Sequence, residues 1–265
     1  MIICADDFGL AGDIDRAILD LADRNRISAV SSLVAAPASA RATFSSLRER
    51  RERLDLGLHI SLVGDPPLSP AAEVASLVRE DGRCFPFRWL LLRSLAGRVR
   101  SDDATREIQR QYERFVDWFG QPPDFIDSHL HVHQFPGICA GLLRFLASLP
   151  GGDRPYVRNS WMPPAKIARQ GVAVAKASSI SVFGGVLRRQ LEHAGVRTNT
   201  GFTGVYDYRR YRSFRRYLAR FMACLEPGNA IVMTHPGLND PWRRAEYEGL
   251  LASSLPQDRA RRYGF

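Results

Sequence analysis

Short apolar runs alternate along the chain with longer segments in which apolar residues recur every three or four positions. Strand-like runs lie at 2–5, 27–34, 54–59, 124–129, 155–160 and 230–235, and helix-like segments at 13–26, 39–51 and 138–149. Such alternation indicates parallel strands covered by helices. At least six units over this length favour a barrel over a small doubly wound domain. We therefore expect an α/β protein with one (β/α) barrel-like domain over residues 1–265, closed or incomplete.

The stretch 63–120 interrupts this alternation and is expected to be an insertion between units. Residues 63–82 are rich in proline and alanine, and a polar helix is predicted near 102–119. Between them, the segment FPFRWLLLRSLAGRVR is apolar and basic together. Its apolar residues either form a lid or belong to the core.

Sequence composition indicates the cellular compartment in which the protein is expected. No apolar run approaches the roughly 20 residues of a membrane span, and the start MIICADDFG lacks a signal-like pattern, so a cytoplasmic protein is expected. The four cysteines are widely separated and form no CxxC pair, which argues against a disulfide framework or a zinc-cysteine site. We expect them to be small buried residues.

Charge adds a second clue. The net charge of +9 comes mainly from arginine, clustered at 48–53, 208–217 and 259–262. Nucleic acid, an anionic membrane surface or simple solvation can each explain such clusters. No helix-turn-helix, zinc-finger or RNP-type pattern accompanies them, so nucleic acid is the least favoured partner.

Histidine is concentrated in the stretch DSHLHVH. Three of the six histidines, His129, His131 and His133, alternate there with Leu130 and Val132. We predict a strand that ends near His129 and continues into a loop before the helix at 138–149. Neutral imidazoles are good ligands for divalent metals, whereas a single histidine more often only packs and forms hydrogen bonds. Three histidines beside Asp127 favour a metal site.

Polar residues lie at or near the ends of five of the predicted strands. In parallel α/β folds, functional groups gather at the carboxyl ends of the strands. The residues in question are Asp6, Asp7, His59, Asp127, His129, Arg158 and His235. Of the adjacent carboxylates of Asp6 and Asp7, one can bind a metal while the other handles a proton. The alternative is that this pair caps the following helix, and that His235 is an ordinary core histidine.

An aspartate with two histidines leaves metal positions open, as catalytic sites require. His235 is placed to protonate a leaving group, and Arg158 can keep Asp6 ionised through a bidentate contact. These features together predict a metal-dependent hydrolase.

In their order along the chain, ADDFG, GLH at 57–59, DSHLHVH, VRNS and THPG resemble the YdjC-like carbohydrate deacetylases, the ChbG/HpnK group. The resemblance spans residues 4–237. It implies a barrel-like fold related to polysaccharide deacetylases, and metal-dependent removal of acetyl from an N-acetylated sugar. It also implies that Asp7, His59 and His129 are ligands, with His131 and His133 as less favoured choices, that Asp6 is the base and that His235 is the acid. One divalent ion is expected, zinc or magnesium first, with manganese, cobalt or nickel as alternatives.

The group includes enzymes for chito-oligosaccharides and enzymes for N-acetylglucosaminyl lipids such as hopanoids. The stretch 208–225 has arginines on one side and an apolar helical face on the other, formed by Tyr211, Phe214, Leu218, Phe221, Met222 and Leu225. This pattern favours a lipid-linked substrate and a peripheral position at the inner membrane surface. An ordinary core-facing helix has the same pattern.

Two other functions fit the sequence. In the first, His129 and His131 are the HxH pair of an amidohydrolase-type barrel, although such sites usually begin on the first strand. In the second, the protein is a catalytically silent sugar-binding or membrane-binding relative. The presence of a candidate base and acid argues against the latter. The sequence leaves the oligomeric state open.

Overall fold

A computed structural model describes residues 1–35, 41–151, 154–226, 228–253 and 263. The described residues contain one sheet of seven parallel strands in the order β5-β4-β3-β2-β1-β7-β6. The strands are β1 (Ile2–Phe8), β2 (Ala29–Ser32), β3 (Asp55–Ile60), β4 (Phe125–Ser128), β5 (Tyr156–Val157), β6 (Phe202–Thr203) and β7 (Ile231–Thr234). Six of them fall on the predicted runs. The two-residue β6 is too short to produce a recognisable apolar pattern.

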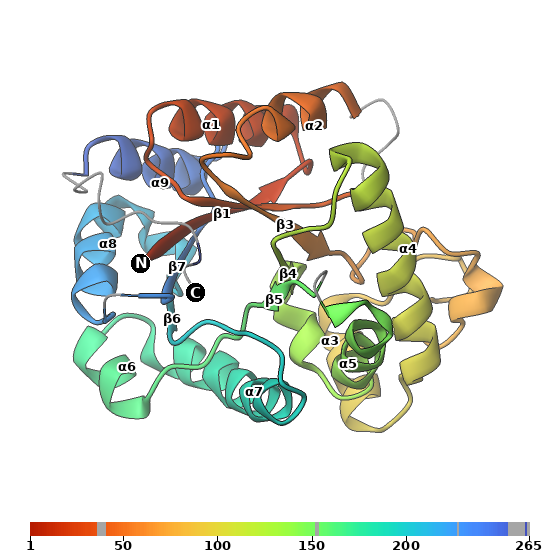
Figure 1. Cartoon of the computed structure of the whole chain (residues 1–265). Coiled ribbons are helices and arrows are strands. Elements are labelled where there is room, and N and C mark those ends of the chain that lie inside the picture. Colours follow the sequence, from red (N-terminus) through yellow and green to blue (C-terminus); the bar gives the residue numbers. More distant parts are fainter. Residues whose placement is uncertain (36–40, 152–153, 227, 254–262, 264–265) are drawn as a thin grey trace.

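Helices surround the outer face of this sheet (Figure 1). They are α1 (Gly12–Asp23), α2 (Arg41–Arg48), α3 (Phe87–Leu95), α4 (Ser101–Phe119), α5 (Ile138–Ser148), α6 (Pro164–Gln170), α7 (Val174–His193), α8 (Phe214–Ala223) and α9 (Pro241–Leu251). Three short 3-10 segments are η2 (Ala71–Val74), η3 (His129–Gln134) and η5 (Tyr208–Ser213). The α/β barrel-like expectation is confirmed in an incomplete, curled form.

The sheet curls so strongly that residues on distant strands meet inside it. In a flat sheet, β5 and β1 lie four strand spacings apart, or about 19 Å. The guanidinium of Arg158, the residue after β5, nevertheless donates to both carboxylate oxygens of Asp6 on β1, at 2.7 Å each. The concave face of the sheet therefore encloses an interior that side chains from both halves can reach.

The chain before β6 draws the two edges of the curled sheet together. Thr198 forms a parallel bridge with Val157 of β5, whose N–H donates to the carbonyl of Arg197 at 2.9 Å. Asn159 and Asn199 exchange further hydrogen bonds, including Asn159 N to Asn199 Oδ1 at 2.8 Å. This connection fixes the position of Arg158, which lies between Val157 and Asn159.

Side chains alternate between the two faces of each strand. On β1, Ile3 and Ala5 pack with the helices, whereas Ile2 and Cys4 belong to a second cluster on the concave face. The concave face is apolar at the amino ends of the strands and polar at their carboxyl ends, where Ser31, His59 and Asp127 are buried. The sequence prediction that polar groups gather at one rim agrees with this arrangement.

Residues 61–100 lie between β3 and the helix α4, which packs on β3, α2 and α5. The segment contains η2 and α3. Leu90 of α3 is buried, whereas Trp89, Leu92 and Leu95 are exposed. The helix α3 is thus partly core and partly an uncovered apolar surface.

Helix α8 uses its apolar face within the protein. Phe214, Leu218 and Phe221 are buried in the main core, with at most 2% of each residue exposed. The amphipathic pattern of 208–225 is therefore that of a core-facing helix with arginines on its outer side. The arginine cluster at 259–262 lies outside the described residues. Among the helices described, none combines the length and apolar character needed to span a bilayer.

The unpredicted helix α7 lacks a strong apolar pattern. Its buried positions are mostly small, with Ala177, Ser181 and Gly184 preceding Leu187 and Leu191. A Cβ on Gly184 would come within 2.5 Å of the Ser160 backbone. Close approach of this helix, and not bulky side chains, accounts for its packing.

Candidate active site

Asp7 has a strained backbone at the carboxyl end of β1. Its φ of 72° lies in the left-handed region, and the pairing of β1 with β2 is irregular between Ala5 and Phe8. Regular alternation would point Asp7 toward the helices, like Ile3 and Ala5. The distortion turns its carboxylate instead toward His59 of the concave face. Strain of this kind persists only where the surrounding structure holds it in place, and it clusters at active sites.

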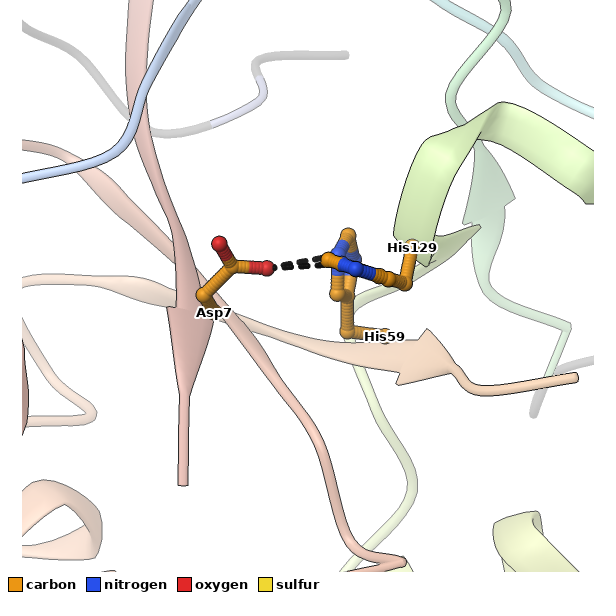
Figure 2. Close-up of side chains that lie close together, drawn as sticks. All are labelled: Asp7, His59 and His129. Atoms are coloured by element: carbon orange, nitrogen blue, oxygen red, sulfur yellow. Dashed lines mark hydrogen bonds and ion pairs between the residues drawn. The ribbon is translucent and has the colours of Figure 1, made fainter. Parts of the chain in front are cut away.

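Asp7, His59 and His129 bring three ligand atoms together, all within 4.8 Å of one another (Figure 2). Asp7 Oδ1 is 2.9 Å from His129 Nδ1 and 3.5 Å from His59 Nε2. The side chains of Asp7 and His59 are buried, whereas that of His129 is 29% exposed. The cluster is therefore reached from solvent on the side of His129.

His59 is held by groups behind it. It pairs with Asp127 in the register of β3 and β4, and its Nδ1 is 2.6 Å from Asp127 Oδ1. Ser31 Oγ donates to the same carboxylate oxygen. Burial favours the neutral ring, but Asp127 and Asp7 outweigh it and raise the pKa of His59 to about 10. A carboxylate at Nδ1 directs Nε2 toward Asp7, as in metal sites with a carboxylate behind the histidine.

Gly57 of the GLH motif has a packing role. A Cβ at this position would lie 2.3 Å from the ring of Phe125, which occupies the neighbouring place on β4. The glycine thus allows β3 and β4 to place His59 and Asp127 side by side.

Arg243 of α9 binds the other oxygen of Asp7. Its Nη2 is 2.7 Å from Oδ2, and both side chains are buried. Burial alone would raise the pKa of Asp7, but hydrogen bonds from His129 and His59 hold it well below the usual range. Asp7 is therefore a carboxylate with Oδ2 engaged and Oδ1 facing the histidines.

Asp6 belongs to a second buried cluster, with Arg158 at its centre. Arg158 binds Asp6 bidentately, and its Nη2 is 2.8 Å from Asp127 Oδ2. The Cys4 thiol donates to Asp6 Oδ1 at 3.3 Å. Burial opposes ionisation of Asp6, but Arg158 overcomes it and lowers the pKa of that carboxyl. The contact expected between Arg158 and Asp6 is present.

His235 follows β7 and approaches Asp6. Its Nε2 is 4.0 Å from Asp6 Oδ2, and its Nδ1 is buried without a hydrogen-bond partner among the described residues. Burial lowers the pKa of His235 to about 4, so the ring is neutral near pH 7. Tyr208 and Trp242 lie against it, with ring centroids 5.9 and 6.0 Å away.

His131 and His133 do not converge with this set. His133 Nδ1 is 2.7 Å from Ser128 Oγ and its Nε2 is 2.7 Å from the Arg158 carbonyl, so both ring nitrogens are engaged. His131 faces Ser160 and the ring of Phe202, and its φ of 59° bends η3 away from the line of β4. This geometry favours His129 as the ligand and gives the HxH alternative no support.

Two supporting residues of the site, Arg243 and Glu246, were not predicted from the sequence. Arg243 lies on α9 and is buried there. Glu246, one turn later, accepts from His235 N at 2.5 Å and from the Tyr206 hydroxyl at 2.7 Å. Neither residue follows a strand, so the expectation that functional groups lie at the carboxyl ends of strands does not include them. The four cysteines are buried and free, as expected.

A divalent metal fits the first cluster and not the second. Asp7, His59 and His129 offer one carboxylate and two imidazoles, a set that suits zinc and leaves further positions open. Cys4, Asp6 and Asp127 also lie within 4.8 Å of one another. The guanidinium of Arg158 already binds both carboxylates of that group. The ligand assignment stays a prediction, with the fit of its donor atoms in its favour.

Known proteins resemble this chain in sequence and fold. The model of the family described as YdjC-like protein matches residues 1–261. A chitooligosaccharide deacetylase of Serratia marcescens is 36% identical over 138 residues, 52% of each chain. A carbohydrate deacetylase of Mus musculus is 27% identical over 251 residues, which cover 89% of this chain and 77% of that protein.

The matched part of the chain spans about half the length of the chitooligosaccharide deacetylases. In fold, the chain resembles the crystal structure of an Enterococcus faecalis V583 protein to which cellobiose-phosphate cleavage is ascribed. The TM-score is 0.71 at 20% identity, with 99% of this chain and 95% of that chain covered. This likeness concerns architecture alone. Since the family model matches nearly the whole sequence, the chain belongs to the YdjC-like protein family.

Proposed function

We propose that the protein is a metal-dependent hydrolase that removes acetyl from an N-acetylated amino sugar. The observation that carries the proposal is the convergence of Asp7, His59 and His129 within 4.8 Å, beside an ionised Asp6. The names of the Serratia and mouse relatives, a chitooligosaccharide deacetylase and a carbohydrate deacetylase, support the reaction and the class of substrate.

The residues divide into holding groups and proton-handling groups. Asp7, His59 and His129 would hold a divalent ion, with Asp127 and Arg243 fixing the orientation of His59 and Asp7. When bound, such an ion polarises a carbonyl and lowers the pKa of water toward about 7. Asp127 keeps Nδ1 of His59 occupied, so Nε2 is the nitrogen that serves the ion.

Asp6 and His235 are suited to proton transfer. Asp6 is a carboxylate at neutral pH and can accept a proton from water, while Arg158 holds both its oxygens in place. His235 is 4.0 Å from Asp6 and neutral near pH 7, so it must first receive the proton that Asp6 accepted from water before it can donate one. The leaving amine of the sugar would then receive a proton from His235 Nε2.

The test is acetate release. Purified protein is stripped with chelator, loaded with zinc, magnesium, manganese, cobalt or nickel in turn, and incubated with chito-oligosaccharides and N-acetylglucosaminyl lipids. We expect acetate and a new sugar amine to appear in equal amounts, and only with metal present. The control is Asp6→Asn, which leaves the ligand atoms untouched.

Two results would contradict the proposal. One is full acetate release after complete metal removal, which would show that the reaction needs no ion bound by the Asp7 cluster. The other is shortening of the oligosaccharide or release of phosphate without acetate, which would point to glycosidic or phosphate cleavage. Comparison of the soluble and lipid-linked substrates separates the two substrate classes.

A further inference from the structure

The helix α3 carries an apolar stripe that nothing in the described part of the chain covers. Trp89, Leu92 and Leu95 are 62%, 57% and 58% exposed. They are spaced three residues apart, so they lie on one side of the helix. Leu90, on the other side, is fully buried and anchors α3 to the core. The stripe therefore belongs to a firmly attached helix and not to a loose segment.

The segment that carries the stripe is rich in arginine. The 20 residues from 82 to 101 include five arginines and no carboxylate. Within the described residues, Arg88 and Arg98 are exposed and form no ion pair, while the guanidinium of Arg93 lies over the ring of Phe85. Tryptophan and leucine flanked by arginine suit a helix that lies in the interface of an anionic bilayer.

The helix α3 is also joined to the segment that carries His129. Phe87 packs on Phe135, with ring centroids 5.7 Å apart, and Ser94 Oγ donates to the carbonyl of Pro136. Phe135 and Pro136 directly follow η3, which begins at His129. A surface that contacts α3 would therefore lie near the segment through which solvent reaches the candidate site.

The charge of a binding partner decides which partner fits this stripe. A second copy of this chain would bring a protein of net charge +9, and a second pair of unpaired arginines, against the first. An anionic lipid surface receives the apolar stripe and pairs with Arg88 and Arg98 at once. We propose that α3 is a membrane-docking helix that binds the surface of anionic bilayers through Trp89, Leu92 and Leu95. This binding does not depend on the proposed deacetylation.

The experiment is sedimentation of the purified protein with vesicles of phosphatidylcholine, alone or mixed with phosphatidylglycerol. We expect binding to the mixed vesicles that weakens as salt rises, and little binding to phosphatidylcholine alone. Replacing Trp89, Leu92 and Leu95 by glutamine should weaken binding about tenfold or more, because the apolar contact is lost while helix propensity is kept.

Matched variants locate the contact. Val182→Gln with Val186→Gln removes exposed apolar groups from α7 and should leave binding unchanged. Arg212, Arg215 and Arg216, changed together to glutamine, test the outer side of α8 and should reduce binding less than Arg88→Gln with Arg98→Gln. Tryptophan fluorescence should shift to the blue on binding in the wild type but not in Trp89→Phe.

Three outcomes would overturn the proposal. The first is no binding of the wild type to mixed vesicles, and the second is equal binding by the triple glutamine variant. The third is a concentration-dependent dimer, seen by sedimentation velocity without lipid, that the triple variant abolishes. Circular dichroism and acetate release from a soluble oligosaccharide show whether the variants remain folded and, separately, whether the proposed deacetylation holds.

Discussion

Two buried acidic clusters lie side by side inside the curled sheet, and each brings three potential ligand atoms within 4.8 Å. In the first, Asp7 faces two imidazoles. In the second, Asp6 and Asp127 face a guanidinium. The residues of both clusters lie at the same rim of the sheet. Only the second cluster has a permanent positive charge between its carboxylates, that of Arg158.

The difference shows how one fold can keep two buried carboxylates ionised with different partners. A buried carboxylate needs a positive partner because burial favours its neutral form. Arg158 is a permanent partner for Asp6, which leaves that group no need of a metal. Asp7 has Arg243 on one oxygen only, and its other oxygen meets histidines that can exchange a proton for a metal ion. The Asp7 cluster is thus the one in which a metal ion could take the place of a proton.

The largest expected effect comes from breaking the Asp7 cluster. His59→Ala, Asp7→Ala and His129→Ala should each weaken binding of the proposed divalent ion, on the order of 10³-fold for the buried His59, because water replaces a lost ligand poorly. Elemental analysis after dialysis and calorimetric titration with zinc measure the loss. Activity on an N-acetylated sugar should fall with it.

His131→Ala and His133→Ala are the controls for this experiment. The first should keep the metal, and so should the second once its folding is verified, since His133 supports Ser128 and the Arg158 carbonyl. Metal loss in His131→Ala with full retention in His129→Ala would show that the ligand assignment is wrong.

The second cluster can be broken by removing its positive charge. Arg158→Gln takes the bidentate ion pair away from Asp6 and leaves Asp127 with His59 alone. The loss of one partner of a buried pair costs about 3–5 kcal/mol of stability. We expect divalent ions to restore part of this loss, because the variant opens a second cation site. Chemical unfolding with and without zinc measures both effects, and the same comparison on wild type shows the contribution of the first site.

An unfolding free energy close to that of the wild type would contradict this view of the second cluster. Arg158→Lys is the matched variant. It keeps the charge but has no planar fork to bind Asp6 bidentately, so it should lose stability by less than Arg158→Gln.

The outline of the fold could be predicted because apolar runs bounded by polar residues mark buried parallel strands. The carboxyl ends of those runs also pointed to Asp6, Asp7, His59 and His235, since parallel strands bring such ends to one rim. Two elements could not be predicted because they depend on tertiary packing or are very short. Helix α7 is buried largely through alanine, serine and glycine, which give no apolar pattern, and β6 is only two residues long.

The supporting groups of the site could not be predicted because their roles arise from tertiary contacts. Arg243 reaches Asp7 across 236 positions of sequence. The inward turn of Asp7 depends on a left-handed backbone that no local pattern announces. The choice among His129, His131 and His133 likewise rests on the left-handed Leu130 and His131, which redirect the chain after β4.

A smaller effect distinguishes proton transfer from metal binding. Asp6→Asn should keep the metal and the affinity for substrate but lower turnover by roughly 10²-fold, the usual scale for a lost general base. Turnover is measured from acetate release, and metal content by elemental analysis. Metal loss in this variant would make Asp6 a ligand and would remove the distinction between the two clusters.

The smallest effect concerns Glu246, which links His235 to α9 beside both clusters. Burial raises the pKa of Glu246 from an ordinary 4.5 to about 7, so the folded protein holds a proton there that the unfolded chain has lost. The contribution to stability is therefore complete below about pH 4.5 and disappears as the pH rises to about 7, a change on the order of 2–3 kcal/mol.

Glu246→Gln, which can still accept from His235 N and donate to the Tyr206 oxygen, should lack this decline. Urea unfolding of both proteins between these pH values measures it. Parallel curves would show that Glu246 is ionised throughout, and the link between α9 and His235 would then be a charged one.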